Sequence, residues 1–290
     1  MSKKLNTLGD IWLDSYDLIR KSPRLLFPLS IVAFFEALWL ELLSFSLQPP
    51  LKSVFLPPIK RFSSEMYLHY PAFLFIVPRF FGYGQLLLYI FAGGILTAIT
   101  MVMAAGTQEG PLLTFRAAWK KVRKHLFPLI LISLFIVFLL GFVSGREASF
   151  LMAGFEFAGK GFLHKALGLL LKAFHYLNFL IAVAIQTFVL FIFPFLVLEN
   201  KKFFRAIGEG IGFGGRHFGR VFLLFLLPTL FYSPIWFLKG KVTFLVQTTR
   251  YPEVILWVLG MGIAATLLVD TFIAVSAALF FVRTRHEKSV

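Results

Sequence analysis

Cysteine is absent from the chain, and charged residues are scarce. Without cysteine the protein cannot form disulfide bonds, thiolate metal sites or a cysteine nucleophile. Only 15% of the 290 residues are charged, and 14 acidic residues stand against 29 Lys and Arg. Because soluble domains carry about 25% charged residues, this composition excludes an ordinary soluble protein.

Apolar residues dominate the rest of the chain and fall into long runs. Hydrophobic residues make up 58% of the sequence, and 38 residues are Phe. Six runs approach the roughly 17–25 residues that a helix needs to cross a bilayer; they cover about residues 25–47, 85–105, 126–143, 177–198, 221–238 and 254–282. Backbone groups inside a bilayer must hydrogen-bond within their own segment, so the runs predict helices. We therefore expect an all-α polytopic integral membrane protein with six transmembrane helices in a single membrane domain, residues 1–290.

The segments before the first, third and fifth runs share a pattern. Two of them end in a basic cluster followed by the letters LFPL, at Leu26–Leu29 and Leu126–Leu129. Each segment places apolar and charged residues on opposite faces at helical spacing, which predicts an amphipathic helix lying in the membrane interface. The chain is therefore expected to contain three repeats, at about residues 5–105, 110–198 and 201–282. Each repeat would be an interfacial amphipathic helix followed by a helical hairpin.

Local signals refine this plan. Thr7 and Asp10 have the spacing of a capping box, which predicts the start of the first amphipathic helix. Pro228 should kink the fifth run, because proline cannot donate a backbone hydrogen bond. The glycines of Gly210–Gly215 are expected to break or thin the third amphipathic helix. The apolar stretch Tyr70–Pro78 is too short to cross a bilayer and is expected to be interfacial or re-entrant.

Positive charges lie between the apolar runs rather than in one block. This distribution is typical of loops that contact anionic headgroups, and it argues against nucleic-acid binding. Lys and Arg are more numerous on the side that bears both ends of the chain, which predicts a bacterial inner (cytoplasmic) membrane with both termini in the cytoplasm. The residues expected to contact lipid headgroups are Arg20, Lys21, Arg24, Lys120, Arg123, Lys124, Arg216 and Arg220.

Three acidic residues interrupt the apolar runs. Glu36 and Glu41 lie in the first run, and Asp270 lies near the middle of the sixth. A carboxylate at this depth costs about 2.5 kcal/mol or more, so it should face the helix bundle, be protonated or have a partner. No Lys or Arg lies at the same depth in these runs, which argues against an ion pair.

The expected partners of these acids are polar or acidic. Gln186 of the fourth run, with Thr187 beside it, is one candidate, and a proton shared between Glu36 and Asp270 is another. Two interpretations stay open: a proton relay or ion-coupled pathway, and hydrogen bonds that only hold the helices together.

Signatures of an active site or a metal site are missing. The six His residues form no H-x-x-x-H pattern, and no G-x-S-x-G nucleophile motif occurs. Gly210, Gly212 and Gly215 match G-x-G-x-x-G by count, but a dinucleotide site needs a preceding strand and a βαβ unit. We therefore expect no enzyme, no metal and no cofactor.

The stretch Phe193–Leu227 resembles bacterial multi-span proteins related to the membrane domain attached to glycerophosphodiester phosphodiesterases. The positions that carry the resemblance are Pro194, Glu199, Ala206, Gly210 and Arg220. The resemblance implies a multi-span architecture; it does not imply phosphodiesterase activity, since it includes no catalytic domain.

Two functions are compatible with these observations. The leading expectation is a non-enzymatic inner-membrane scaffold or accessory protein that contacts anionic lipid, with membrane lipids and a membrane-protein complex or homo-oligomer as partners. The alternative is a transporter or channel for a small or amphiphilic solute, proton-coupled through Glu36 and Asp270.

Overall fold

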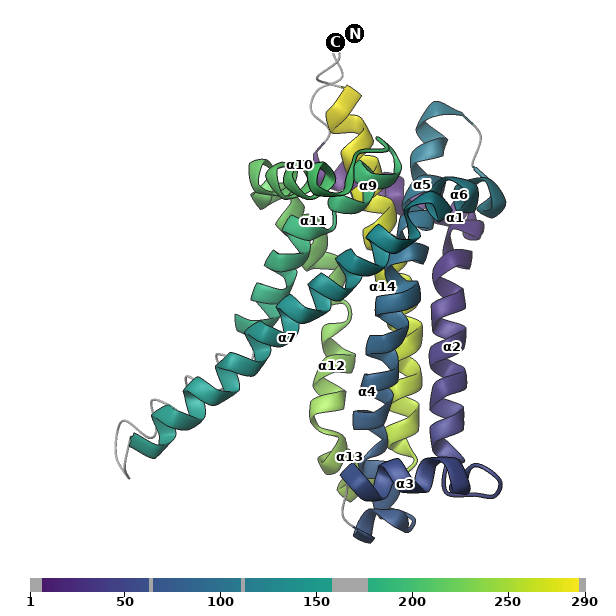
Figure 1. Cartoon of the computed structure of the whole chain (residues 1–290), viewed down its shortest axis with the longest axis vertical. Helices are drawn as coiled ribbons and strands as arrows, with labels where there is room; N and C mark the ends of the chain where they lie inside the picture. The colour runs from purple at the N-terminus through teal and green to yellow at the C-terminus, as the bar shows by residue number, and fades with distance from the viewer. Residues whose placement is uncertain (1–6, 63–64, 111–112, 158–176, 287–290) are drawn as a thin grey trace.

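The structure is a computed structural model, and it describes residues 7–62, 65–110, 113–157 and 177–286. Every regular element in these ranges is helical (Figure 1). In chain order the α-helices are α1 (Leu8–Lys21), α2 (Phe27–Ser44), α3 (Lys52–Phe62), α4 (Val77–Leu88), α5 (Gly94–Glu109), α6 (Phe115–Val122), α7 (Leu126–Phe157), α9 (Ile192–Val197), α10 (Phe203–Arg216), α11 (Phe218–Leu230), α12 (Ser233–Gly240), α13 (Val242–Thr249) and α14 (Val254–His286). The helix α9 is the last part of a longer apolar helix, Leu177–Val197.

Five helices of the described residues are long and apolar enough to cross a membrane. They are Pro23–Ser44, Val77–Thr107, Phe115–Gly141, Leu177–Val197 and Val254–Arg285, and a sixth crossing exists if α11 and α12 form one broken span. Many large apolar side chains of these helices point outward, which suits a surface in contact with lipid. The prediction of an all-α protein with several membrane-length apolar helices is confirmed for the described residues.

The second apolar helix begins about two turns before the predicted run. Pro78 occupies its first turn, where the missing N–H would have had no partner inside the helix. The stretch Tyr70–Pro78 forms a 3-10 turn, η3 (Ala72–Phe75), followed by the start of α4. Its side chains Phe73 and Leu74 are buried, because they pack into a small core at the end of the bundle that carries α3.

The fifth apolar run is broken rather than straight. α11 and α12 meet at an angle of 55°. Pro228 lies in the last turn of α11, where it cannot donate to the carbonyl of residue 224, and α11 ends two residues later. The predicted interruption of this run near Pro228 is confirmed.

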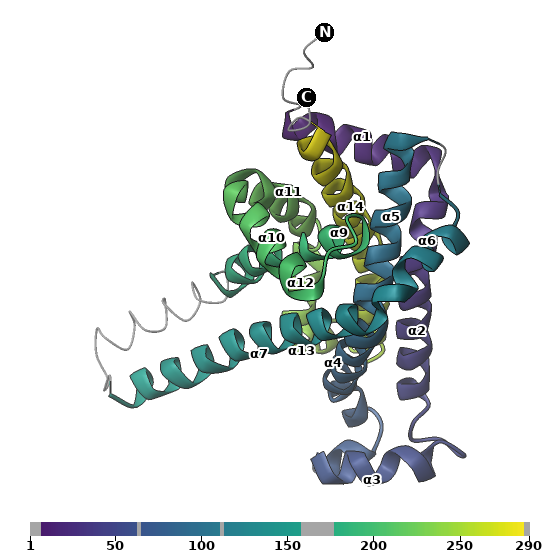
Figure 2. The ribbon, with the colours of Figure 1, turned by 45° about the horizontal axis from the view of Figure 1, so that its top comes forward.

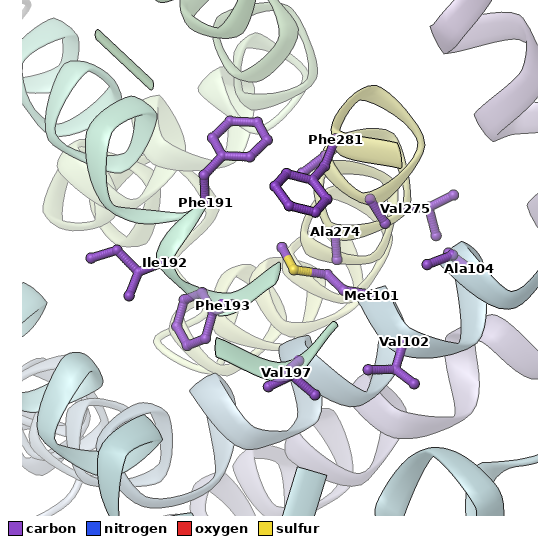
Figure 3. Close-up of a cluster of buried hydrophobic side chains, with 14 of the residues drawn as sticks. Met101, Val102, Ala104, Phe191, Ile192, Phe193, Val197, Ala274, Val275 and Phe281 are labelled. Atoms are coloured by element: carbon purple, nitrogen blue, oxygen red, sulfur yellow. The ribbon is translucent and has the colours of Figure 1, made fainter. Parts of the chain in front are cut away.

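The main core lies where α5, α14 and the Leu177–Val197 helix meet (Figure 3). Phe191 and Phe281 are buried with their ring centroids 6.5 Å apart. Small side chains such as Ala274 and Ala278 line the same stretch of α14 and are buried. These small side chains leave room for neighbouring helices to approach that face of α14, as is common for helices packed in membranes.

The three amphipathic helices α1, α6 and α10 lie at the same end of the molecule (Figure 1). The capping box predicted for α1 is present: the Thr7 side chain accepts from Asp10 N–H, and Asp10 accepts from Thr7 N–H. In α6 the cap is Thr114, which accepts from Ala117 N–H.

Each amphipathic helix packs on the end of an apolar helix. α1 packs on α14, α6 packs on α5, and α10 packs on α9. The residues that α1, α6 and α10 turn inward include Ser15, Ala118 and Ala206, each of which is fully buried. A small side chain at these positions lets each amphipathic helix lie close to its neighbour.

One helix departs from the bundle. α7 has 32 residues, runs well beyond the predicted end at residue 143, and leaves the bundle at an angle in both views (Figures 1 and 2). Its outward side chains Phe127, Phe135 and Phe138 are exposed. The segment expected to join the third and fourth runs, residues 158–176, lies outside the described residues.

Candidate functional site

A buried carboxyl group joins α2 to α4. Glu36 is only 1% exposed, and Gln85 Nε2 donates a hydrogen bond to Glu36 Oε1 at 2.9 Å. A hydrogen bond from a neutral amide gives a buried carboxyl group a partner without placing a second charge in the bundle. Glu36 therefore faces the helix bundle, as predicted.

A second carboxyl group, that of Asp270 in α14, accepts a hydrogen bond from the π-helical turn that follows α4. η4 (Tyr89–Gly93) is a single turn of π-helix between α4 and α5, a distortion that is frequent at functional sites. Within this turn, a Cβ atom at position 93 would lie 2.8 Å from Tyr89 Cδ1, so glycine makes room for the Tyr89 ring. Tyr89 Oη donates a hydrogen bond to Asp270 Oδ2 at 2.7 Å.

A lysine enters the same region from the broken span. Lys239, in the last turn of α12, donates from Nζ to Tyr232 Oη at 2.7 Å. Its Nζ lies against α14, 3.0 Å from where a Cβ atom of Gly262 would be. The bend between α11 and α12 allows this contact, because it places Tyr232 and Lys239 on a segment that runs beside α14.

A cavity of about 270 Å³ lies beside Asp270. Its walls come from η4 and α5, α7, the Leu177–Val197 helix and α14. Most of the lining is apolar, and the polar side chains that face it are Tyr89, Thr97, Ser133, Gln186 and Asp270. Gln186 is also exposed on the surface of the molecule, so the cavity opens there.

The structure brings together some of the predicted polar residues and separates others. Glu36 and Asp270 have different partners, so the expectation of a proton shared directly between them does not match the geometry. Gln186 lines the cavity of Asp270, whereas the buried Thr187 donates to Val183 O within its own helix. Glu41 lies in the last turn of α2 and is exposed.

Several partners were missed by sequence reasoning: Gln85, Tyr89, Tyr232 and Lys239. Gln85 and Tyr89 are four residues apart and therefore share a helix face, a spacing that could have marked them as partners for buried acids. Lys239 lies one residue beyond the predicted end of the fifth run. Its proximity to α14 depends on the bend, which a hydropathy pattern does not predict.

The basic end of the molecule, defined here by α1, α6, α10 and the residues that follow each of them, carries all eight predicted headgroup contacts. Every one of these Lys and Arg side chains is exposed. Other cations at this end are paired: Arg283 Nη2 lies 2.6 Å from Asp14 Oδ2, and Arg285 Nε lies 2.9 Å from Glu199 Oε1. These two pairs tie the end of α14 to α1 and to the segment before α10.

A further ion pair stabilises α10. Arg205 Nε donates to Glu209 Oε1 at 2.7 Å, one helical turn away. This hydrogen bond, with the nearby charge of Lys201, lowers the pKa of the Glu209 carboxyl below its ordinary value. Glu209 therefore stays ionised and keeps part of the positive charge of α10 neutralised.

The glycine-rich segment forms one continuous helix, so of the two expectations, that its glycines break or thin α10, the break was wrong. Gly210 instead allows close packing, because a Cβ atom there would lie 2.8 Å from the backbone N and Cα of Ile192. Ala206 and Gly214 are buried on the same face of α10. The small residues at positions 206 and 210, which carry the family resemblance, thus lie at the contact between α10 and α9.

No group of three or more His, Asp or Glu side chains that could hold a metal ion occurs among the described residues. No protein-family model, curated protein or solved structure matches this chain.

Proposed function

We propose that the protein is a non-enzymatic membrane scaffold whose basic end contacts anionic lipid on the cytoplasmic side of a bacterial inner membrane. The observation that carries this proposal is the placement of α1, α6 and α10 at one end, with their eight predicted contact residues exposed. Exposed Lys and Arg beside an apolar, membrane-length bundle would lie at the level of lipid headgroups.

A threefold organisation of the chain supports the proposal. The amphipathic helix of each predicted repeat packs on the last apolar helix of another repeat. α6 of the second repeat packs on α5 of the first, α10 of the third packs on α9 of the second, and α1 of the first packs on α14 of the third. Three repeats arranged in this closed order would hold three basic helices at one membrane surface. The resemblance to membrane domains attached to phosphodiesterases remains a prediction consistent with such a scaffold.

The proposal is tested by native mass spectrometry of the protein reconstituted with phosphatidylglycerol and phosphatidylethanolamine. The test variant removes three exposed cations of α6 and the turn after it. Its substitutions are Lys120→Gln, Arg123→Gln and Lys124→Gln. Each Lys or Arg near an anionic surface contributes about 1 kcal/mol. Removing three should therefore lower the affinity for phosphatidylglycerol by about a hundredfold.

A matched control removes three exposed cations at the other end of the molecule: Lys52→Gln, Arg61→Gln and Lys241→Gln. This variant has the same change in net charge and should retain most of the bound phosphatidylglycerol. Equal losses in the two variants would show that net charge alone attracts the lipid and would contradict a specific basic end.

A second candidate function is a proton-coupled pathway for a solute. It is favoured by the two carboxyl groups inside the bundle, Glu36 and Asp270, and by the broken span beside them. Broken helices and intramembrane carboxyl groups are frequent at the binding sites of transporters. Threefold repetition is less typical of these proteins, so this function ranks second.

The pathway is tested by proton flux into proteoliposomes that contain a trapped pH-sensitive dye. Flux above that of empty vesicles, lost in Glu36→Gln and retained in Glu41→Gln, would favour the pathway over the scaffold. Wild-type flux equal to that of empty vesicles would contradict a proton pathway that works without a solute, and would favour carboxyl groups that only join helices.

A further inference from the structure

The cavity beside Asp270 contains a carboxyl group that lacks a cationic partner. Among the described residues, Tyr89 is the hydrogen-bond donor to Asp270, and no Lys or Arg forms an ion pair with it. The lysine of this region, Lys239, extends toward Gly262, two turns of α14 away from Asp270. A carboxylate at this depth is costly without a counter-charge, so the cavity is better suited to a cation than to an anion.

The other side chains that line the cavity indicate the chemical character of the ligand beyond its charge. Gln186, Ser133 and Thr97 can accept hydrogen bonds near the carboxyl group. The aromatic side chains Phe193 and Tyr89 also line the cavity, and aromatic rings can attract organic cations. The other lining side chains, such as Leu140, are aliphatic and suit an alkyl body.

We propose that this cavity binds a small alkyl ammonium compound, with its charged nitrogen at Asp270 and its alkyl part along α7 and the Leu177–Val197 helix. The volume of about 270 Å³ lies just below the range of ordinary ligand pockets, so the ligand is smaller than a typical drug. It enters through the opening at Gln186. This proposal deepens the second candidate function by naming a class of solute, and it concerns binding rather than movement across the membrane.

The test uses three probes of equal chain length: hexylamine, which is protonated at neutral pH, hexanol and hexanoate. The full-length protein is placed in nanodiscs of phosphatidylcholine, whose headgroups carry no net charge, and binding is followed by ligand-observed NMR with empty nanodiscs as the blank. Hexylamine should bind to the wild type with clearly higher affinity than hexanol, and hexanoate should not bind above the blank.

The variant Asp270→Asn keeps the shape of the side chain and removes its charge. It should weaken hexylamine binding by about thirtyfold or more, as expected for the loss of a buried charge pair, and should leave hexanol binding unchanged. Glu41→Gln removes an exposed carboxylate outside the cavity and should bind hexylamine as the wild type does.

Two results would overturn the proposal. One is wild-type binding of hexanol as tight as that of hexylamine, which would indicate a neutral site. The other is equal hexylamine binding by the wild type and Asp270→Asn. The comparison of probes requires no variant, so it decides the matter even if Asp270→Asn does not fold. The binding test does not measure flux. A wild-type protein without proton flux could therefore still bind hexylamine, and the two outcomes can be told apart.

Discussion

Gly210→Ala is a direct test of how α10 is held. If α10 only rested on a lipid surface, replacing glycine by alanine would stabilise it by up to about 1 kcal/mol, the usual difference in helix propensity. In the structure, however, the added Cβ would lie 2.8 Å from two backbone atoms of Ile192. Backbone atoms cannot rotate away, so α10 would have to shift.

The expected cost follows from these two opposing effects. Overpacking a tight contact costs about 1–3 kcal/mol, which exceeds the gain in helix propensity. Gly208→Ala is the matched control in the same helix, because no atom lies within 4 Å of the added Cβ. Both variants gain the same helix propensity, so we expect Gly210→Ala to be less stable than Gly208→Ala by the overpacking cost, about 1–3 kcal/mol.

The assay is thermal unfolding of the two purified variants in one mild detergent. A difference of this size corresponds to a melting temperature lower by about 2 °C or more in Gly210→Ala. Equal melting temperatures, or a more stable Gly210→Ala, would refute the close contact between α10 and α9.

Two further predictions concern the core and the basic end. Phe191→Ala, at a fully buried position, should cost about 3–5 kcal/mol. Phe127→Ala, at a side chain that is 71% exposed, should change the melting temperature little; equal effects would contradict the main core. The pKa of Glu209 is lower in the folded state than its ordinary value of 4.5. The pair of Glu209 with Arg205 therefore stabilises the protein at pH values above 4.5, and this stabilisation is lost as the pH falls through the lower pKa of the folded state. Glu209→Gln should therefore lose less stability than the wild type when melting is compared between about pH 5 and pH 3, and identical pH profiles would argue against the pair.

Hydropathy and helical spacing predicted the apolar helices and the amphipathic helices before them, because both patterns are local. The capping box at Thr7 and the break near Pro228 were predictable for the same reason: each depends on residues within one or two turns. Glu36 and Asp270 stood out because a carboxyl group in an apolar run is unusual.

The partners of these acids depend on how distant helices pack, and a single sequence does not encode that packing in a local pattern. Gln85 reaches Glu36 across 49 positions, and Tyr89 reaches Asp270 across 181. The role of Gly210 stayed open between a break and a thinner helix, because glycine serves equally well to break a helix and to admit a close neighbour. Only the position of Ile192 distinguishes the two roles.

In the proposed orientation, the basic helices α1, α6 and α10 lie on one side of the membrane and α3 lies on the other. Since the chain has no cysteine, single cysteines can be introduced at exposed positions and labelled in intact cells with a membrane-impermeant maleimide. Leu13→Cys, Lys120→Cys and Phe204→Cys should be protected until the membrane is opened, whereas Val54→Cys and Tyr251→Cys should label at once. Labelling of Leu13→Cys, Lys120→Cys or Phe204→Cys from the side that labels Val54→Cys would contradict this orientation.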